Sequence, residues 1–218
     1  MLIMGYVFRR FFSFRKKSKF IWPTFLGNGI KQLILSSHRL LLSLNLSNTG
    51  ITGEELVGFR EPLINLEELT LKSCLRLTDT GLRRFLTVCG ERFKRLHLEA
   101  LSISANKLAG TDTQFSGLES LVLKECHNLQ DEGFCQILDL CGGQLKSLQV
   151  ENCAVTGGGQ LARFANTFPY LNHLISRSDN QRILTKDLTL ELIKLSKDRH
   201  TLIDCATYSN NLLSDEQL

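Results

Sequence analysis

Residues 66–89, LEELTLKSCLRLTDTGLRRFLTVC, and residues 118–141, LESLVLKECHNLQDEGFCQILDLC, are two copies of one pattern that begin 52 residues apart. Further copies begin at residues 41, 93 and 145, and a weaker one begins at 171, so successive copies start 25 to 27 residues apart. Upstream, residues 29–34 match residues 81–86 and form a half-copy without a strand. Recurrence at this spacing predicts a chain of stacked, similar units.

Each copy follows the pattern L-x-x-L-x-L-x-x-C-x-x-L-T-D-x-G-L-x-x-L, although Thr49 and Leu101 replace the cysteine in the first and third copies. The L-x-L alternation predicts a short strand with both leucines on one buried face. The G-L-x-x-L part has helical spacing, and Asp79, Asp131 or Thr78 would cap the helix that follows. The cysteine position should hold a small buried group. One unit cannot bury its own apolar face, so successive strands should stack in parallel with the helices outside.

The unit resembles the cysteine-containing leucine-rich repeat of F-box/leucine-rich-repeat proteins and of the antagonist-of-mitotic-exit family. The resemblance covers roughly residues 29–176. It implies an α/β fold, a right-handed leucine-rich-repeat solenoid (horseshoe) with a concave parallel sheet and outer helices. It also implies substrate recognition for a ubiquitin ligase, with ligase subunits or substrates as partners. The F-box itself, a helical motif that starts with Leu-Pro, is not found in residues 1–40.

Composition divides the 218 residues into three predicted parts. Residues 1–28 form a basic and aromatic segment, because residues 1–53 hold eight Lys or Arg and no Asp or Glu. Three interpretations of this segment stay open: a mitochondrial presequence, a segment on an anionic membrane surface, or a flexible start. Residues 29–205 form the repeat region, whose last unit is degenerate and whose cap has Leu188, Leu192 and Leu195 at helical spacing. Residues 206–218 are a polar tail.

No chemical motif stands out from the repeats. The seven cysteines are odd in number, contain no C-x-x-C pair and have no zinc spacing, which favours reduced thiols in the cytoplasm or nucleus, with mitochondria as the alternative. The glycine run at residues 157–159 lacks the Lys-Ser/Thr pair of a phosphate loop. The sequence therefore predicts no catalytic residues, no cofactor, no metal site and no enzyme.

The outward strand positions are the candidate functional residues. Counted from the first Leu of each copy, positions +2, +4, +6 and +7 should face solvent on the concave side. Position +6 alternates in charge from Lys72 to Glu151, which indicates a ladder of ion pairs and a polar surface for a protein partner. We expect a monomer that binds protein and not nucleic acid, because no basic stripe with aromatic residues is present. The candidate partner-binding residues are Asn45, Asn48, Glu68, Thr70, Lys72, Arg95, His97, Glu99, Lys124, Glu125, Gln149 and Glu151.

Overall fold

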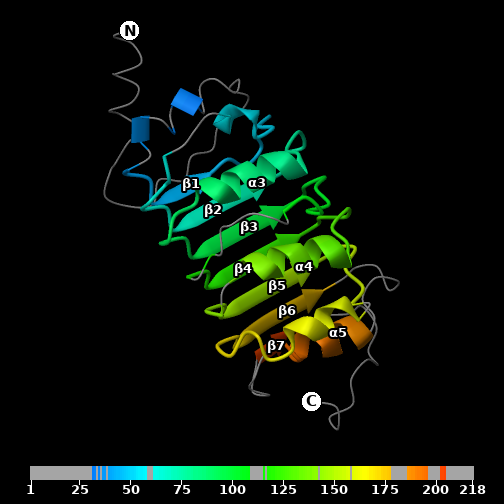
Figure 1. Cartoon of the computed structure of the whole chain (residues 1–218). Coiled ribbons are helices and arrows are strands. Elements are labelled where there is room, and N and C mark those ends of the chain that lie inside the picture. Colours follow the sequence, from blue (N-terminus) through cyan, green and yellow to red (C-terminus); the bar gives the residue numbers. More distant parts are fainter. Residues whose placement is uncertain are drawn as a thin grey trace.

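The computed structural model of the chain describes residues 31–32, 34, 36–37, 39–57, 61–108, 115, 117–141, 143–157, 159–177, 186–195 and 202–204. Seven strands form one sheet in which spatial order follows chain order (Figure 1). Each neighbouring pair is parallel. The fold is therefore α/β with a parallel sheet. The strands are β1 (Ser43–Asn45), β2 (Glu68–Lys72), β3 (Arg95–Glu99), β4 (Ser120–Lys124), β5 (Ser147–Glu151), β6 (His173–Arg177) and β7 (Leu202–Asp204).

The pairing register repeats the alignment of the sequence copies. Leu69 pairs with Leu96, Leu96 with Leu121, and Leu121 with Leu148, so the same pattern position meets itself on every neighbouring strand. Both leucines of each L-x-L in β2, β3 and β4 are buried. The predicted strand register is confirmed. Ser176 is an exception to the apolar rule, because it occupies the second inward position of β6 and is fully buried.

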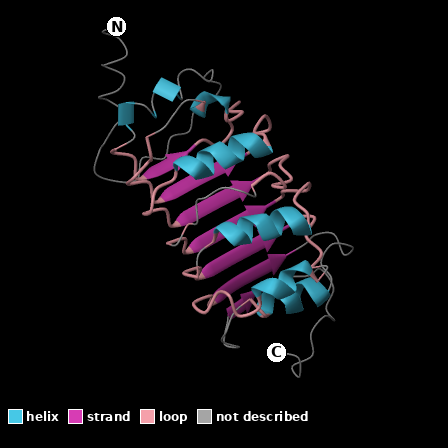
Figure 2. Cartoon of the chain, viewed as in Figure 1, coloured by secondary structure: helices cyan, strands magenta, loops and turns pink. Residues whose placement is uncertain are grey.

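The helices lie on one side of the sheet (Figure 2). Among the described residues, the units that begin at 66 and 118 each contain an α-helix, α3 (Asp79–Val88) and α4 (Asp131–Leu140), and both units have 27 residues. The units of 25 and 26 residues that begin at 41 and 145 contain only the short 3-10 helices η1 (Glu54–Leu56) and η2 (Gln160–Phe164). The predicted helical segment is therefore an α-helix in the units of 27 residues and a 3-10 helix in these two shorter units. A 3-10 helix rises further per residue than an α-helix, so a shorter unit can span the same distance.

Residues 101–108 of the third unit contain no helix. The sequence showed this unit to be unusual, because Leu101 replaces the cysteine. Leu101 is nevertheless buried, as are Cys74, Cys126, Cys153 and Thr49 at the same position of other units. The prediction of a buried group at this position is confirmed. The requirement for a small group does not hold for the third unit.

The glycine of the D-x-G pattern allows neighbouring units to touch. A Cβ atom on Gly81 would lie 1.9 Å from the Thr52 carbonyl oxygen, and one on Gly133 would lie 1.8 Å from the Ser104 carbonyl oxygen. Any other residue would force the two units apart at these points. The first turns of the two helices that hold these glycines, α3 and α4, therefore pack directly against the backbone of the preceding unit.

Thr78 and Asp79 have different roles at the start of α3. Thr78 is the N-cap, since its Oγ1 accepts a hydrogen bond from the Gly81 N–H at 3.0 Å. Asp79 does not cap the helix. Its Oδ1 accepts hydrogen bonds from the N–H groups of Ser104 and Ala105 at 2.9 and 2.8 Å, and its Oδ2 accepts one from Ser104 Oγ at 2.6 Å. The capping prediction is confirmed for Thr78 and wrong for Asp79.

Asp131 repeats this arrangement one pair of units later. The N-cap of α4 is Gln130, whose side chain makes no capping bond. Asp131 Oδ1 accepts from the N–H groups of Thr156 and Gly157 at 2.7 and 3.0 Å, and Oδ2 accepts from Thr156 Oγ1 at 2.6 Å. Each aspartate thus links its own unit to the following one. We call this arrangement the aspartate clamp.

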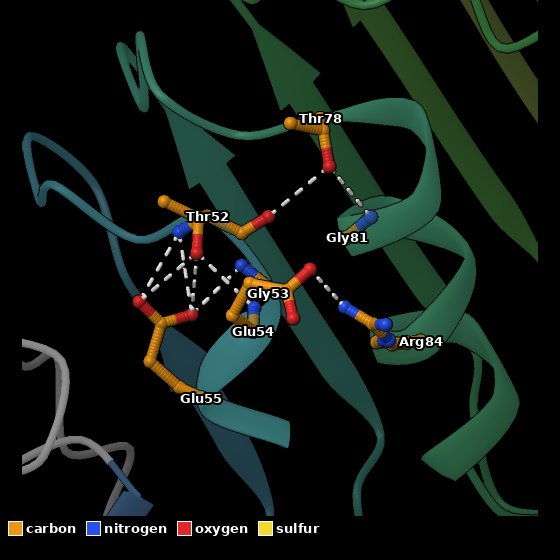
Figure 3. A network of polar contacts seen from close by, with 7 residues as sticks. All are labelled: Thr52, Gly53, Glu54, Glu55, Thr78, Gly81 and Arg84. Carbon is orange, nitrogen blue, oxygen red and sulfur yellow. Dashed lines mark hydrogen bonds and ion pairs between the residues drawn. The ribbon is translucent and has the colours of Figure 1, made fainter. Parts of the chain in front are cut away.

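Polar contacts also join the first two complete units (Figure 3). The carboxylate of Glu55 accepts hydrogen bonds from the N–H groups of Thr52 and Gly53, the latter at 2.7 Å. The Thr78 hydroxyl donates a hydrogen bond to the Thr52 carbonyl oxygen at 3.4 Å. Arg84 of α3 forms an ion pair with Glu54 of η1. The loop before η1 is thereby held against the start of the next helix.

The C-terminal region adds one helix and one strand. The helix α5 (Lys186–Ile193) confirms the predicted helical segment, and Leu188, Leu192 and Leu195 are all buried. Strand β7 pairs with β6 and was not predicted, because its unit lacks the L-x-x-L-x-L pattern. At the other end, residues 31–32, 34 and 36–37 are helical, as the half-copy predicted. The predicted segments 1–28 and 206–218 lie outside the described residues.

Candidate functional site

We call the side of the sheet opposite the helices the open face. It is made by positions +2, +4 and +6 of the six units that contain β1 to β6, and by position +7 of the first five of these units. All twelve candidate residues lie on it, and each is exposed or half-buried. Ten of them belong to strands, whereas Glu125 directly follows β4 and Asn48 lies three residues after the end of β1. Ser47 departs from the expected pattern. It is buried and donates a hydrogen bond to Asn45 Oδ1 at 2.5 Å.

Ion pairs connect neighbouring strands along position +6. Lys72 of β2 pairs with Glu99 of β3. The Nζ of Lys124 on β4 lies 3.1 Å from Glu151 Oε2 on β5. Glu151 Oε1 is also 3.8 Å from a terminal guanidinium nitrogen of Arg177 on β6. The predicted lateral charge ladder is present at the first two pairs, and Arg177 extends it by one strand.

The two signs of charge in this row differ in exposure. The side chains of Lys72 and Arg177 are 46% and 42% exposed, whereas those of Glu99 and Glu151 are 14% and 16% exposed. Lys124 is intermediate at 29%. The carboxylates therefore lie low on the sheet, and the cationic groups stand above them. A molecule approaching the row meets ammonium and guanidinium groups first.

Glu99 is contacted by two side chains of the open face, Lys72 and His97. Burial alone would raise its pKa, but the hydrogen bond and charge of Lys72 hold the pKa of Glu99 below its ordinary value. The Nε2 of His97 lies 3.0 Å from Glu99 Oε2. Burial nevertheless lowers the pKa of His97, against the attraction of Glu99, and the nearby Lys124 and Lys72 lower it further. His97 is therefore neutral at pH 7 and behaves as a polar side chain.

Position +2 forms a second polar row at the other end of the strands. A terminal guanidinium nitrogen of Arg95 lies 3.6 Å from Glu68 Oε2 and 3.8 Å from Glu67 Oε2. Ser147 Oγ and His173 Nδ1 are hydrogen-bonded at 3.1 Å. Exposed pairs of this kind contribute only about 0–1 kcal/mol each. They arrange the surface more than they hold the fold together.

Position +4 forms the row between these two rows. Because His97 is neutral, this row carries no charged group. It begins with Asn45 and Thr70 and continues through His97, Val122, Gln149 and Ile175. No Phe, Tyr or Trp occurs at positions +2, +4 or +6 of β1 to β6. The open face therefore has an uncharged centre between two charged rows, with no aromatic platform for stacking.

The residue at position +7 of the first five units adopts a left-handed conformation without being glycine. The φ angles of Asn48, Ser73, Ala100, Glu125 and Asn152 lie between 50° and 59°. Each N–H group still donates to the next unit, for example Ala100 to the Lys124 carbonyl at 2.9 Å. The inter-strand hydrogen bonds offset the energetic cost of a backbone conformation that non-glycine residues rarely adopt. These residues border the open face at the same place on every strand.

The candidate set did not extend to β6, whose residues His173, Ile175 and Arg177 also lie on the open face. Their signal was present in the sequence, because the weak copy that begins at Leu171 places them at positions +2, +4 and +6. The structure shows that this copy pairs in the same register as the clear copies. The candidate surface therefore extends one strand further than predicted.

The described residues also bear on chemistry and on membranes. No group of three or more His, Cys, Asp or Glu side chains that could hold a metal ion occurs among them. The six described cysteines are free and buried. Burial raises the pKa of Cys141, to about 12, and that of Cys89, so both thiols are protonated at pH 7. Within the part of the chain that the structure describes, no helix is long and apolar enough to span a membrane.

No family model matches the chain, and its distant relatives among known proteins include the following two. The chain is 29% identical over 195 residues to the DNA repair protein rhp7 of Schizosaccharomyces pombe, covering 83% of this chain and 34% of that protein. It is 28% identical over 180 residues to the putative RNA-binding protein EEED8.10 of Caenorhabditis elegans, covering 82% of this chain and 23% of that protein. The chain thus spans about a third and a quarter of these relatives' lengths.

Proposed function

We propose that the chain is a right-handed leucine-rich-repeat solenoid that acts as a non-catalytic protein-interaction module through the open face of its sheet. The observation that carries the proposal is the repetition of half-buried polar positions in one register across β1 to β6. A broad polar surface of this kind suits a protein partner, because it can be bound over several strands at once.

The charge of the open face favours protein over nucleic acid. Its described positions +2, +4, +6 and +7 hold four Lys or Arg and four Glu, so their net charge is 4 − 4 = 0 with histidine neutral. Nucleic-acid binding needs cations that neutralise phosphates, and single strands also need aromatic residues for stacking. The names of the two relatives make nucleic acid the alternative to test directly.

A role in substrate recognition for a ubiquitin ligase is the more specific form of the proposal. It is supported by the likeness of the repeat pattern to F-box/leucine-rich-repeat proteins. Affinity purification of the full chain should then recover cullin-complex subunits together with the partner. The alternative role, a mitochondrial or membrane-associated assembly factor, depends on residues 1–28, which lie outside the described residues. Purification of a form that starts at Gly29 distinguishes the ligase role from the assembly-factor role. Only the assembly-factor role predicts that mitochondrial inner-membrane partners are lost when residues 1–28 are removed.

The decisive experiment places a photoreactive amino acid on the open face. Val122 lies half-buried at the centre of that face, and Thr87 is exposed on α3, which lies on the opposite side. We expect the probe at Val122, and not the probe at Thr87, to crosslink a specific protein. The substitution Val122→Arg should abolish co-purification of that protein, and Thr87→Arg should not. Equal crosslinking at both sites, or tight binding of single-stranded RNA or duplex DNA at physiological salt, would overturn the proposal.

A further inference from the structure

The row of position +6 presents cations at every second strand. Lys72, Lys124 and Arg177 belong to β2, β4 and β6, and the pairing register aligns them across Glu99 and Glu151. Adjacent strands lie about 4.8 Å apart, so successive cations are spaced by roughly 9.6 Å at the backbone. The carboxylates between them are the less exposed members of the row. The surface therefore has a regular cationic period that its neutral net charge conceals.

This period can be compared with the periods of peptide backbones. Side chains on one side of a β-strand recur about every 6.7 Å, which does not match. Equivalent side chains of an α-helix recur about every 10.5 Å over seven residues, which overshoots by about 2 Å across three cations. A polyproline II segment has three residues per turn and rises about 3.1 Å per residue, so every third side chain recurs at about 9.3 Å. That spacing fits three cations to within about 0.6 Å.

We infer that the open face binds an acidic segment of a protein in the polyproline II conformation, with a carboxylate at every third residue opposite Lys72, Lys124 and Arg177. The inference rests on the proposed function and names the chemistry of its partner. The segment runs across the strands, along the direction in which the units stack. The uncharged row at position +4 lies beside it and can receive the residues between the carboxylates. Nucleic acid is disfavoured by Glu99 and Glu151, which lie between the cations and would repel a continuous row of phosphates.

Labelled synthetic peptides test the inference by fluorescence anisotropy with the full chain. The probe is Glu-Pro-Pro repeated five times, which places a carboxylate at every third residue of a polyproline II helix. The control has the same composition with its glutamates at every second residue. We expect the first peptide to bind at least about fivefold more tightly, because only it satisfies all three cations together. Its affinity should fall as salt is raised.

Substitutions locate the binding site. We expect Lys72→Gln, Lys124→Gln and Arg177→Gln each to weaken binding by about two- to fivefold, as exposed ion pairs do, and the triple variant to abolish it. The matched control replaces Arg76, Arg92 and Lys107 by Gln, which removes the same charge from exposed turns outside the strands. Circular dichroism establishes that each variant is folded. If the triple variant does not fold, the comparison of the two peptides decides alone.

Three results of the peptide experiments would overturn the inference. They are equal binding of the two peptides, equal loss in the two triple variants, or tighter binding of a helical peptide with glutamates seven residues apart. Preferential binding of a single-stranded RNA would also refute it and would assign the cations to phosphate. Crosslinking of a protein at Val122 would still stand if the peptides failed, so the inference and the proposed function can fail separately.

Discussion

Replacing Asp79 by Ala tests whether the aspartate clamp stabilises the stack of units. Its carboxylate accepts two backbone hydrogen bonds, from Ser104 and from the fully buried Ala105, together with the Ser104 hydroxyl. A hydrogen bond to a charged acceptor contributes about 1.5–3 kcal/mol. Ser104 is half-buried, so water can replace part of what the substitution removes. We therefore expect Asp79→Ala to lower the free energy of unfolding by about 3 kcal/mol.

The assay is equilibrium urea unfolding followed by circular dichroism. Asp79→Asn is the matched control, because its side-chain oxygen can still accept the two backbone bonds, and it should cost about 1 kcal/mol or less. Thr78→Ala removes the N-cap of α3 and should cost about 1 kcal/mol. Asp131→Ala should cost less than Asp79→Ala, because its partner Thr156 is exposed.

A loss below about 1 kcal/mol for Asp79→Ala would refute this reasoning, because it would show that water satisfies the two N–H groups as well as the carboxylate does. A loss equal to that of Thr78→Ala would refute it in another way. The aspartate would then act only through the start of its own helix. A double-mutant cycle with Ser104→Ala separates the hydroxyl bond from the two backbone bonds.

Three other substitutions test the core, the contact between units and a titratable group. Leu69→Ala should lower the free energy of unfolding by about 2–5 kcal/mol through the cavity it leaves, and an unchanged melting temperature would contradict the strand register. Gly133→Ala should lower the free energy of unfolding, measured by heat or urea, by about 3 kcal/mol or more, because the added Cβ would lie 1.8 Å from the Ser104 carbonyl oxygen. The control Gly143→Ala should change it by less than about 1 kcal/mol, because its Cβ would lie 3.7 Å from the nearest atom, the Thr167 carbonyl oxygen. The pKa of His97 is lower in the folded chain than its ordinary value of 6.5. The stability that the neutral His97 side chain contributes is therefore fully present above pH 6.5, and it is lost as the pH falls from 6.5 toward the pKa of the folded chain. The melting temperature of the native chain should thus fall on acidification below pH 6.5 more steeply than that of His97→Gln, and parallel curves would argue against a lowered pKa.

The strand register could be predicted because the repeat pattern contains it. Aligning Leu69 with Leu121 in the sequence aligns them in the sheet, since each unit adds one strand beside the last. The same alignment placed the candidate residues on one face. It could not give their relative heights, which depend on how each side chain packs against its neighbours. The exposure of Lys72 above Glu99 is therefore a property of the structure alone.

The helices and the clamp were harder to predict for a different reason. The apolar spacing is similar in all units, but the length available before the next strand decides between an α-helix and a 3-10 helix. Asp79 follows Thr78 where a cap is expected, and local rules favour both residues for that role. Its actual partners lie 25 and 26 residues away, in the next unit. A local pattern cannot distinguish a cap from a bond between units, although the match of Asp79 with Ser104 and of Asp131 with Thr156 at one separation was an available signal.

The alternation of long and short units makes the structural module a pair of units. The long units that begin at residues 66 and 118 are 52 residues apart, and each carries one α-helix. A chain shortened by residues 66–117 would join β1 to β4 and keep a short unit followed by a long one. Removing a single unit would instead bring two long units or two short units together. Two adjacent long units would crowd their α-helices, and two adjacent short units would have no α-helix between them. Such a chain therefore gains or loses length most easily in steps of two strands, and its binding surface can be resized by the same step.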